Sequence, residues 1–333
     1  MNISVLGAGG WGTTLAILLQ QNGHQVKLWE FDRNYAEEIA LSRDNHTYLP
    51  GIKIPNEIFV THSLEECCYN KHMIILAVPT QFIRSVLQGI KGYDFKNTTF
   101  VSVAKGIEKD TLKTVSHIIR DEIVNITPDQ IGVLSGPSHA EEVARKIPTA
   151  VVAASHDPIT AKQIQSTFLT SYLRIYSTTD ILGVEYGGAL KNVIAIGAGI
   201  IDGAKFGDNT KAAIMTRGIA EIARLGIALG ANPETFSGLS GMGDLIVTCI
   251  SKHSRNRFVG EEIGKGKKLN EILNNMQMIA EGVETCRAVH QLSVKHQIET
   301  PIASAVYKIL FEEQDPTKVT YELMTRDMKA EDE

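Results

Sequence analysis

The fold is indicated most strongly by the residues Ile3-Ser4-Val5-Leu6-Gly7-Ala8-Gly9-Gly10-Trp11-Gly12, close to the start of the chain. A short strand signal runs directly into glycines at the first, third and sixth positions of a GxGxxG pattern. The first glycine permits a tight turn, the second lets a pyrophosphate approach the backbone, and the third allows close helix–strand packing. The helix that follows offers free N–H groups to that anion. The stretch therefore predicts a dinucleotide-binding loop; a purely structural glycine turn is the alternative.

The second strand signal, at residues 25–29, ends in an acidic turn. Glu30 follows it directly, 18 residues after Gly12, and Asp32 and Arg33 come next. A carboxylate at this place accepts hydrogen bonds from the ribose hydroxyls of NAD and repels the 2′-phosphate of NADP, whereas an arginine can receive that phosphate. With two acids against one base, we expect NAD as the preferred cofactor and NADP as the alternative. If Glu30 and Asp32 only solvate a surface turn, both cofactors are usable.

Strand and helix signals alternate along the first 180 or so residues. β-Branched runs predict strands at residues 3–6, 25–29, 73–78, 99–103, 131–134 and 150–154, and helical patterns lie between several of them, at residues 13–22, 81–90, 111–123 and 139–146. Such alternation implies βαβ units and a parallel sheet covered on both faces.

After Asp180 the strand signals stop, and helical patterns follow one another between glycine and proline breaks. We therefore expect an α/β domain with a doubly wound parallel sheet over residues 1–182. An all-α domain should follow over residues 183–328. The charged end, residues 329–333, is expected to be a frayed tail.

Composition excludes several classes of protein. The 333 residues are 43% hydrophobic and 21% charged, the balance of an ordinary globular protein. Lys and Arg number 33 against 38 Asp and Glu, which gives a net charge of −5, so no nucleic-acid partner is expected. The four cysteines form no CxxC pair and the ten histidines no HExxH motif, so no metal site is expected.

The hydrophobic segments predict neither a leader nor a membrane span. The N-terminus has no basic region followed by a cleavable apolar stretch. The longest apolar run, at residues 193–201, is far shorter than the ~20 residues that cross a bilayer. We expect this run to be a buried helix in a cytoplasmic protein without stable membrane insertion.

Two charged residues of the second half lie in surroundings that favour chemistry. Lys191 interrupts a run of small and apolar residues at 187–199, so the helix around it should be buried. Desolvation lowers the pKa of a lysine and suits it to general acid–base work, although a lysine that reaches solvent is the alternative. Asp244 lies in Gly241-Met242-Gly243-Asp244, where glycines give a carboxylate close access to a ligand or a lysine. A plain turn is the alternative there.

Three further segments carry candidate binding groups. Ser254-Arg255-Asn256-Arg257 is a compact set of hydrogen-bond donors that suits a phosphate, although a solvated basic turn is the alternative. Lys105 follows the strand signal at 99–103, at the strand end where open α/β sheets bind ligands. Ser135-Gly136-Pro137-Ser138 ends another strand, and its N–H groups and hydroxyls suit a substrate.

Together these motifs resemble the bacterial type of NAD(P)-dependent glycerol-3-phosphate dehydrogenase. The resemblance runs from residue 3 to about residue 323 and includes, in the family's order, GAGGWGT, VAKGIE, SGPSHAEEVA, GALKNVIAIGAGIIDG, TRGIAEIARLG, GLSGMGDLIVTC, SRNR and AEGVET. It implies a Rossmann-type domain followed by a helical domain, usually in a homodimer.

The resemblance also implies roles for individual residues. Lys191 matches the proton acceptor or donor, with Asp244 and Thr248 beside it. The positions that match substrate-lining residues are Lys105, Gly136, Ser138 and Asn192, and those that match the phosphate end are Ser254, Arg255 and Asn256. The positions that match cofactor contacts are Gly7, Gly9, Gly10, Trp11, Gly12, Phe31, Phe82, Lys105, Ala140, Arg255, Ile279 and Glu281. Two positions depart from the family's pattern: His139 stands where an aromatic residue such as Phe is usual, and Gly10 stands where Ser or Ala is common.

The implied reaction is the reversible conversion of sn-glycerol 3-phosphate and NAD(P)⁺ into dihydroxyacetone phosphate and NAD(P)H, which supplies phospholipid synthesis. Two alternatives stay open at this point. A related β-hydroxyacid dehydrogenase would need a clamp for a carboxylate, and SRN with Lys105 suits a phosphate better. A nicotinamide-binding redox sensor without catalysis would not need a buried lysine and a second anion site.

Overall fold

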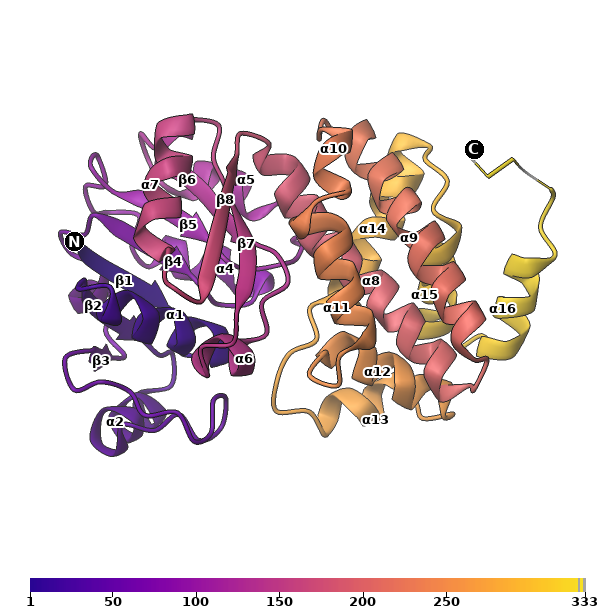
Figure 1. The fold of residues 1–333 in the computed structure, drawn as a ribbon, viewed down its shortest axis with the longest axis horizontal. Helices are drawn as coiled ribbons and strands as arrows, with labels where there is room; N and C mark the ends of the chain where they lie inside the picture. Colours follow the sequence, from indigo (N-terminus) through magenta and orange to yellow (C-terminus); the bar gives the residue numbers. More distant parts are fainter. Residues whose placement is uncertain (329, 332–333) are drawn as a thin grey trace.

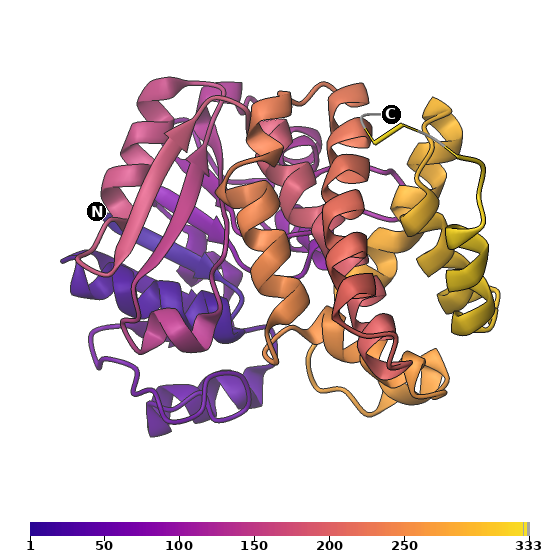
Figure 2. The same cartoon turned by 45° about the vertical axis from the view of Figure 1, so that its right-hand side comes forward.

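A computed structural model describes residues 1–328, 330 and 331. Residues 329, 332 and 333 of the expected frayed tail lie outside the described part. A sheet region and a helical region lie side by side (Figure 1, Figure 2), and the chain passes from one to the other at helix α8 (Ile181–Gly203). The expected domain boundary, between residues 182 and 183, lies in the first turn of this helix. The position of that boundary remains a prediction.

Eight strands form one sheet in the order β3-β2-β1-β4-β5-β6-β7-β8, the crossover pattern of a doubly wound fold. The strands are β1 (Asn2–Leu6), β2 (Gln25–Trp29), β3 (Phe59–Thr61), β4 (Met73–Leu76), β5 (Thr99–Ser102), β6 (Ile131–Ser135), β7 (Thr149–Ala154) and β8 (Leu173–Thr178). The six predicted strands are therefore present, within two residues at each end. The edge strands β3 and β8 were not predicted. β3 has only three residues, and buried residues of β8 alternate with exposed ones, so neither strand forms a continuous apolar run in the sequence.

The predicted parallel sheet has one exception, since β7 runs antiparallel to β6 while every other neighbouring pair is parallel. A parallel connection needs a crossover that returns along the whole sheet. The connection from β6 to β7 contains only the five-residue helix α6 (Ala140–Ala144), which is too short for that return. The helix predicted at residues 139–146 is thus present but shorter than predicted.

Helices pack against both faces of the sheet. They are α1 (Gly10–Gln21), α2 (Arg33–Ser42), α3 (Leu64–Cys68), α4 (Thr80–Gln88), α5 (Val115–Glu122), α6 and α7 (Pro158–Phe168). The glycine loop after β1 requires its glycines: Gly7 has φ of +114°, and a Cβ on Gly12 would collide with the carbonyl oxygen of Gly7. A Cβ on Gly10 would lie 2.6 Å from the carbonyl oxygen of Tyr48, which accounts for glycine at that position.

The helical region is built around α8. Its helices are α8 (Ile181–Gly203), α9 (Asp208–Ala228), α10 (Pro233–Phe236), α11 (Asp244–Ile250), α12 (Arg255–Gly264), α13 (Leu269–Asn274), α14 (Gly282–His296), α15 (Pro301–Phe311) and α16 (Pro316–Met324). Within the described residues, α8 is the one helix long and apolar enough to cross a membrane, and its apolar window is wholly buried inside the protein. The predicted buried helix around residues 193–201 is thus confirmed.

Glycines let α8 and α12 pack backbone against backbone. A Cβ on Gly260 of α12 would collide with the carbonyl oxygen of Ile196, and one on Gly199 of α8 would collide with the carbonyl oxygen of Arg257. Gly203 and Gly264 make similar approaches one turn further along. This spacing holds the first residues of α12 against the middle of α8.

We predict that Gly260→Ala lowers the free energy of unfolding by about 3 kcal/mol, because the backbone of α8 cannot move away from the added methyl group. The gain in helix propensity, about 1 kcal/mol, is smaller. Gly92→Ala is the control, since a Cβ there has no neighbour within 4 Å. Urea denaturation followed by circular dichroism compares the two variants, and equal midpoints would contradict the packing argument.

Candidate active site

Three charged side chains from distant parts of the chain meet in one buried cluster. Asp244, the first residue of α11, accepts hydrogen bonds from Lys191 Nζ on α8 (2.9 Å, to Oδ1) and from Lys105 Nζ after β5 (2.7 Å, to Oδ2). Lys191 Nζ also donates to Thr248 Oγ1 at 2.6 Å. Asp244 is 1% and Lys191 5% exposed. The sequence-based expectation of a buried Lys191 is therefore confirmed, and the side chain does not reach solvent.

The cluster shifts the ionisation of its members. Burial is the largest influence on Lys191 and lowers its pKa to about 8, against the attraction of Asp244. Burial also opposes ionisation of Asp244, but the charges of Lys105 and Lys191 outweigh it and lower the pKa of that carboxyl. Asp244 is thus an anion at neutral pH, and Lys191 exchanges its proton close to neutral pH, as a general acid or base must.

A close contact at a glycine lets α8 and α11 come near enough for Lys191 to contact Asp244. A π-helical turn, Leu239–Gly243, ends immediately before Asp244, and turns of this type are frequent at functional sites. A Cβ on Gly187 of α8 would lie 2.7 Å from the carbonyl oxygen of Ser240 in that turn. Glycine at residue 187 therefore lets α8 approach the turn that carries Asp244.

The ends of β5 and β6 supply the neighbouring groups. Lys105 Nζ donates its second hydrogen bond to the carbonyl oxygen of Gly136 at 2.8 Å, and Asn192 Nδ2 donates to the carbonyl oxygen of Lys105 at 2.8 Å. Ser138 Oγ donates to the same Gly136 oxygen at 3.0 Å. Gly136 has φ of +140°, in the region that favours glycine. Four expected substrate-lining residues thus lie together, joined to the Asp244 cluster through Lys105.

The SRNR segment forms the start of α12. Ser254 is the N-cap residue, and its Oγ accepts a hydrogen bond from the N–H of Arg257 at 3.2 Å. Arg255 is exposed, and within the described part of the chain its guanidinium makes no hydrogen bond or ion pair. The Arg257 guanidinium is turned away and binds Asp202 Oδ2 through Nε at 2.7 Å. Of the two arginines, Arg255 is the one available to a ligand.

One glycine joins this segment to α8. Asn256 Oδ1 accepts a hydrogen bond from the N–H of Gly282 at 2.9 Å. A Cβ on Gly282 would lie 2.8 Å both from that oxygen and from the carbonyl oxygen of Asn192. The structure therefore places the expected phosphate end next to the expected substrate-lining residues.

Glu281 joins the two regions of the protein. Its Oε1 accepts hydrogen bonds from the N–H and the Oγ1 of Thr80, at 2.7 and 2.8 Å, and its Oε2 accepts one from the N–H of Lys105 at 3.3 Å. The carboxylate, expected to contact the cofactor, is therefore already bound by donors after β4 and β5. Sequence reasoning did not identify Thr80, and no motif marks it.

The glycine loop fits the dinucleotide that the fold implies. No side chain caps the N-terminus of α1, and a Cβ on Gly9 would face open space. Three buried polar atoms have no hydrogen-bond partner within the described residues: Trp11 Nε1, Ser135 Oγ and His139 Nε2. Each belongs to an expected ligand contact or to a residue close to one in the sequence. Buried polar groups are rarely left without a partner, so these atoms fit a bound ligand. Ser135 stands in the quoted SGPS motif but was not among the expected contacts.

The acidic turn after β2 lies at the glycine loop. Burial raises the pKa of the Glu30 carboxyl, against the N–H groups of Asp32, Phe31 and Ala8, and Asp32 N–H donates to Glu30 Oε1 at 3.1 Å. The contact with Ala8 places the carboxylate beside the loop. Phe31 is 82% and Phe82 51% exposed, so both rings are open to a ligand.

The remaining expected contacts flank these groups. Ala140 begins α6, within 3.5 Å of where a Cβ on Gly10 would lie, and Ile279 is 44% exposed shortly before α14. No group of three His, Cys, Asp or Glu side chains within the described residues is placed to hold a metal ion.

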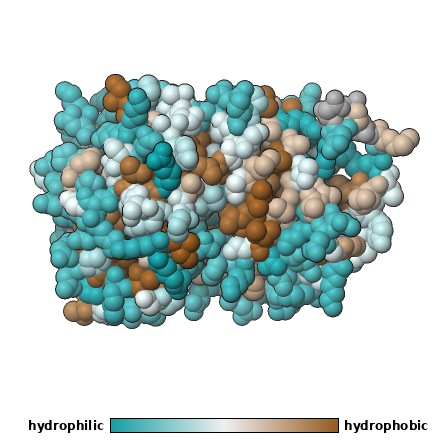
Figure 3. Space-filling model, viewed as in Figure 1, coloured by the Kyte–Doolittle hydropathy of each residue, from teal (hydrophilic) through white to brown (hydrophobic). Residues whose placement is uncertain are grey.

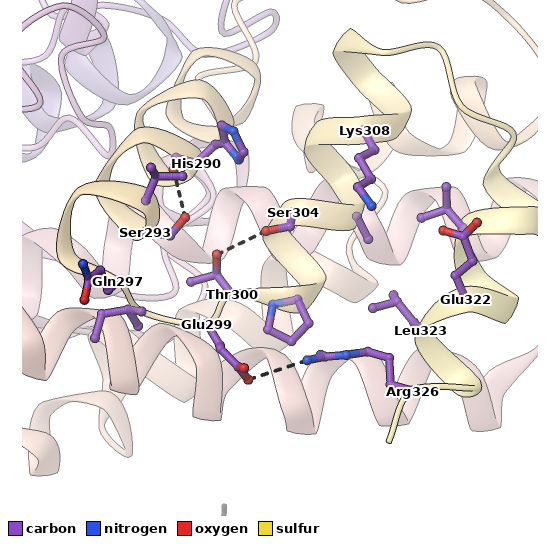
Figure 4. Close-up of a pocket in the computed structure, with 15 residues that line it drawn as sticks. His290, Ser293, Gln297, Glu299, Thr300, Ser304, Lys308, Glu322, Leu323 and Arg326 are labelled. Atoms are coloured by element: carbon purple, nitrogen blue, oxygen red, sulfur yellow. Dashed lines mark hydrogen bonds and ion pairs between the residues drawn. The ribbon is translucent and has the colours of Figure 1, made fainter. Parts of the chain in front are cut away.

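One cavity lies away from these residues. It measures about 570 Å³ and is lined by residues of α14, α15 and α16 (Figure 4). His290, Thr300, Ser304 and Lys308 line it, and none of the expected site residues does. The candidate site is thus defined by its hydrogen-bonded cluster and unpartnered polar atoms.

Comparison with known proteins agrees with this arrangement. Two family models match, the N-terminal part of NAD-dependent glycerol-3-phosphate dehydrogenase over residues 2–161 and the C-terminal part over residues 180–321. Glycerol-3-phosphate dehydrogenases [NAD(P)+] of Thermoanaerobacter sp. and Chlorobium phaeobacteroides are 51% and 50% identical to the chain, and each alignment covers 99% of both proteins.

A solved structure is similar over nearly the whole chain. Glycerol-3-phosphate dehydrogenase from Coxiella burnetii has a TM-score of 0.93 and 34% identity, and the alignment covers 98% of this chain and 99% of that one. The Rossmann-type and helical architecture implied by the sequence is thus confirmed. The family models, the relatives and the shared fold all agree, and the chain belongs to the NAD-dependent glycerol-3-phosphate dehydrogenase family.

Proposed function

We propose that the buried cluster of Lys105, Lys191 and Asp244 is the catalytic centre at which this chain interconverts sn-glycerol 3-phosphate and dihydroxyacetone phosphate. The family assignment decides between the three functions that the sequence left open, in favour of this NAD(P)-dependent oxidoreductase. When bound, the nicotinamide cofactor supplies or accepts the hydride. The observation that carries the assignment of the centre is the buried lysine pair on one carboxylate.

Lys191 is the proton donor in the reducing direction and the acceptor in the other. Its ammonium has three N–H donors, of which Asp244 and Thr248 take two. The third is available for the substrate oxygen that gains a proton. Burial weakens the hold of Lys191 on its proton, and Asp244 keeps the amine oriented.

Lys105 orients and polarises the substrate carbonyl. Asp244 and the Gly136 carbonyl oxygen take two of its three N–H donors, and the third remains for the developing alkoxide. Because Lys105 is held on both sides, this donor is positioned before the reaction, which lowers the cost of reorganisation. Asn192 supports the same loop through the carbonyl oxygen of Lys105.

Arg255 holds the phosphate group at the start of α12. An unpartnered guanidinium forms a bidentate pair with phosphate oxygens, and the N-terminus of a ten-residue helix adds N–H groups and a favourable dipole. Holding the phosphate fixes the reacting carbon relative to Lys191. A dihydroxyacetone phosphate molecule therefore uses both ends of the site.

NAD is the preferred cofactor in this proposal. The Glu30 carboxylate lies beside Ala8 of the glycine loop and is partly buried, so a 2′-phosphate next to it would meet an incompletely solvated negative charge. In the sequence, Arg33 is the one residue of this turn that favours NADP. In the structure its Nε forms an ion pair with Glu37 Oε1 at 3.0 Å.

The proposal includes a homodimer in the cytoplasm that supplies glycerol 3-phosphate for phospholipid synthesis. Hydrophobic side chains gather over α11 on one face of the molecule (Figure 3). Met242, Ile246 and Ile250, spaced four residues apart, are 40%, 43% and 59% exposed. Apolar stripes of this kind mark protein-binding surfaces, which supports self-association through α11.

We predict that Lys191→Met lowers kcat for dihydroxyacetone phosphate reduction by roughly 10²- to 10⁴-fold, the usual worth of a positioned acid or base. Its Kd for NADH should stay within about threefold of wild type, because the glycine loop is untouched. Lys211→Met, which removes a lysine bound to Asp202 at 2.8 Å, is the control and should keep its turnover. Wild-type kcat in Lys191→Met would show that another group transfers the proton.

We predict that Arg255→Leu lowers kcat/KM for dihydroxyacetone phosphate by about 2–5 kcal/mol equivalent, because a charge-assisted pair with the phosphate is lost. Lys252→Leu, which removes an exposed cation three residues earlier, should have little effect. Steady-state kinetics with dihydroxyacetone, which lacks the phosphate, complete the comparison. Equal wild-type efficiency on both substrates would contradict a phosphate site.

We predict that wild type prefers NADH to NADPH by at least about tenfold in kcat/KM, and that Glu30→Ser reduces this preference, since like-charge repulsion is removed. Glu38→Ser, an exposed acid on α2, is the matched control. The ratio of the two kcat/KM values is the measurement. An unchanged ratio in Glu30→Ser would mean that Glu30 does not contact the ribose.

A further inference from the structure

His139 is an ionisable residue at the site that the mechanism above does not use. It is the residue before α6 and follows Ser138, so it lies at the end of β6 among the expected ligand contacts. Its Nε2 is buried and has no hydrogen-bond partner within the described residues. An unpaired buried nitrogen costs about 1–3 kcal/mol, so the position suits a ligand atom that supplies the missing partner.

The surroundings of His139 are positively charged. Burial lowers its pKa, and the charges of Lys191 and Lys105 lower it further, while Glu141 and Glu142 act in the opposite direction. The imidazole is therefore neutral, with one ring nitrogen able to donate. Because two ammonium groups lie nearby, the ligand atom that accepts this hydrogen bond is better suited to an anion than to a cation.

The phosphate end of the site lies next to the same ring. The ring of His253 stands 5.7 Å from that of His139, centroid to centroid. His253 directly precedes Ser254, the N-cap residue of α12, and Arg255 follows. The pair of rings thus spans from the sheet region to the helix start at which a phosphate is expected.

We propose that His139 is a specificity-determining residue whose Nε2 donates a hydrogen bond to the phosphate of the bound substrate. This inference rests on the proposed function and adds a contact to it. A phenylalanine at this position would fill the same space but could not donate a hydrogen bond. A role in packing alone makes the opposite prediction, because Phe would then replace His without loss.

The test compares His139→Phe and His139→Gln with wild type. His139→Phe should raise KM for dihydroxyacetone phosphate and the inhibition constant of inorganic phosphate together, by roughly 10- to 100-fold, the worth of a hydrogen bond to a charged group. kcat should change by less than about threefold, since the proton transfer does not involve this ring. His139→Gln retains a donor and should recover part of the loss. His296→Phe, at an exposed histidine of α14, is the control.

Three results would overturn the inference. KM and the phosphate inhibition constant could both stay at their wild-type values in His139→Phe, which would leave a packing role. KM could rise without the inhibition constant, which would place the contact at the hydroxyl end. Kd for NADH could rise instead, which would assign the ring to the cofactor. Should His139→Phe fail to fold, His139→Gln and its phosphate inhibition constant decide. Wild-type turnover tests the proposed reaction separately.

Discussion

The buried carboxylate of Asp244 between two lysines constrains the rest of the structure. An unpaired charge at 1% exposure would cost several kcal/mol, so Lys105 and Lys191 must both stay in contact with it. Lys105 belongs to the sheet region, whereas Lys191 and Asp244 belong to two helices of the helical region. The ion cluster therefore joins the two regions at the same point where it holds the proposed proton donor. Stability of this junction and readiness for proton transfer have one physical origin.

Glycine packing supplies the rest of the geometry. Gly187 lets α8 approach the turn before Asp244, Gly260 lets α12 contact α8 by its backbone, and Gly282 brings α14 between Asn192 and Asn256. Each approach would be blocked by a single methyl group. The candidate proton donor and the candidate phosphate contact lie on different helices, and these contacts set the distance between them. A substrate bound at both ends, as we propose, would therefore contact a helical scaffold with little freedom to adjust.

Local sequence patterns predicted the sheet core and part of the candidate site, and the family resemblance supplied the other candidate residues. Neighbouring residues alone indicate the GxGxxG loop, the six inner strands and an apolar helix around Lys191. The reversal of β7 was not predicted, since it depends on how far α6 can carry the chain. Thr80 was missed for a similar reason: its partner Glu281 is 201 residues away, and no local signal joins them. The sequence also could not show that Arg257 binds Asp202 and leaves Arg255 for a ligand, because Asp202 is distant in the sequence.

The proton-transfer role that we propose for Lys191 depends on its burial and on its contact with Asp244. Its most direct test is the pH profile of kcat/KM for dihydroxyacetone phosphate reduction, which reports ionisations of the free enzyme. Wild type should lose activity as pH rises through a pKa of about 8, because the donor must be protonated. In Asp244→Asn that limb should move to lower pH, since the negative charge that favours the ammonium is gone. A wild-type profile without this limb, or a limb that stays in place in Asp244→Asn, would contradict the account.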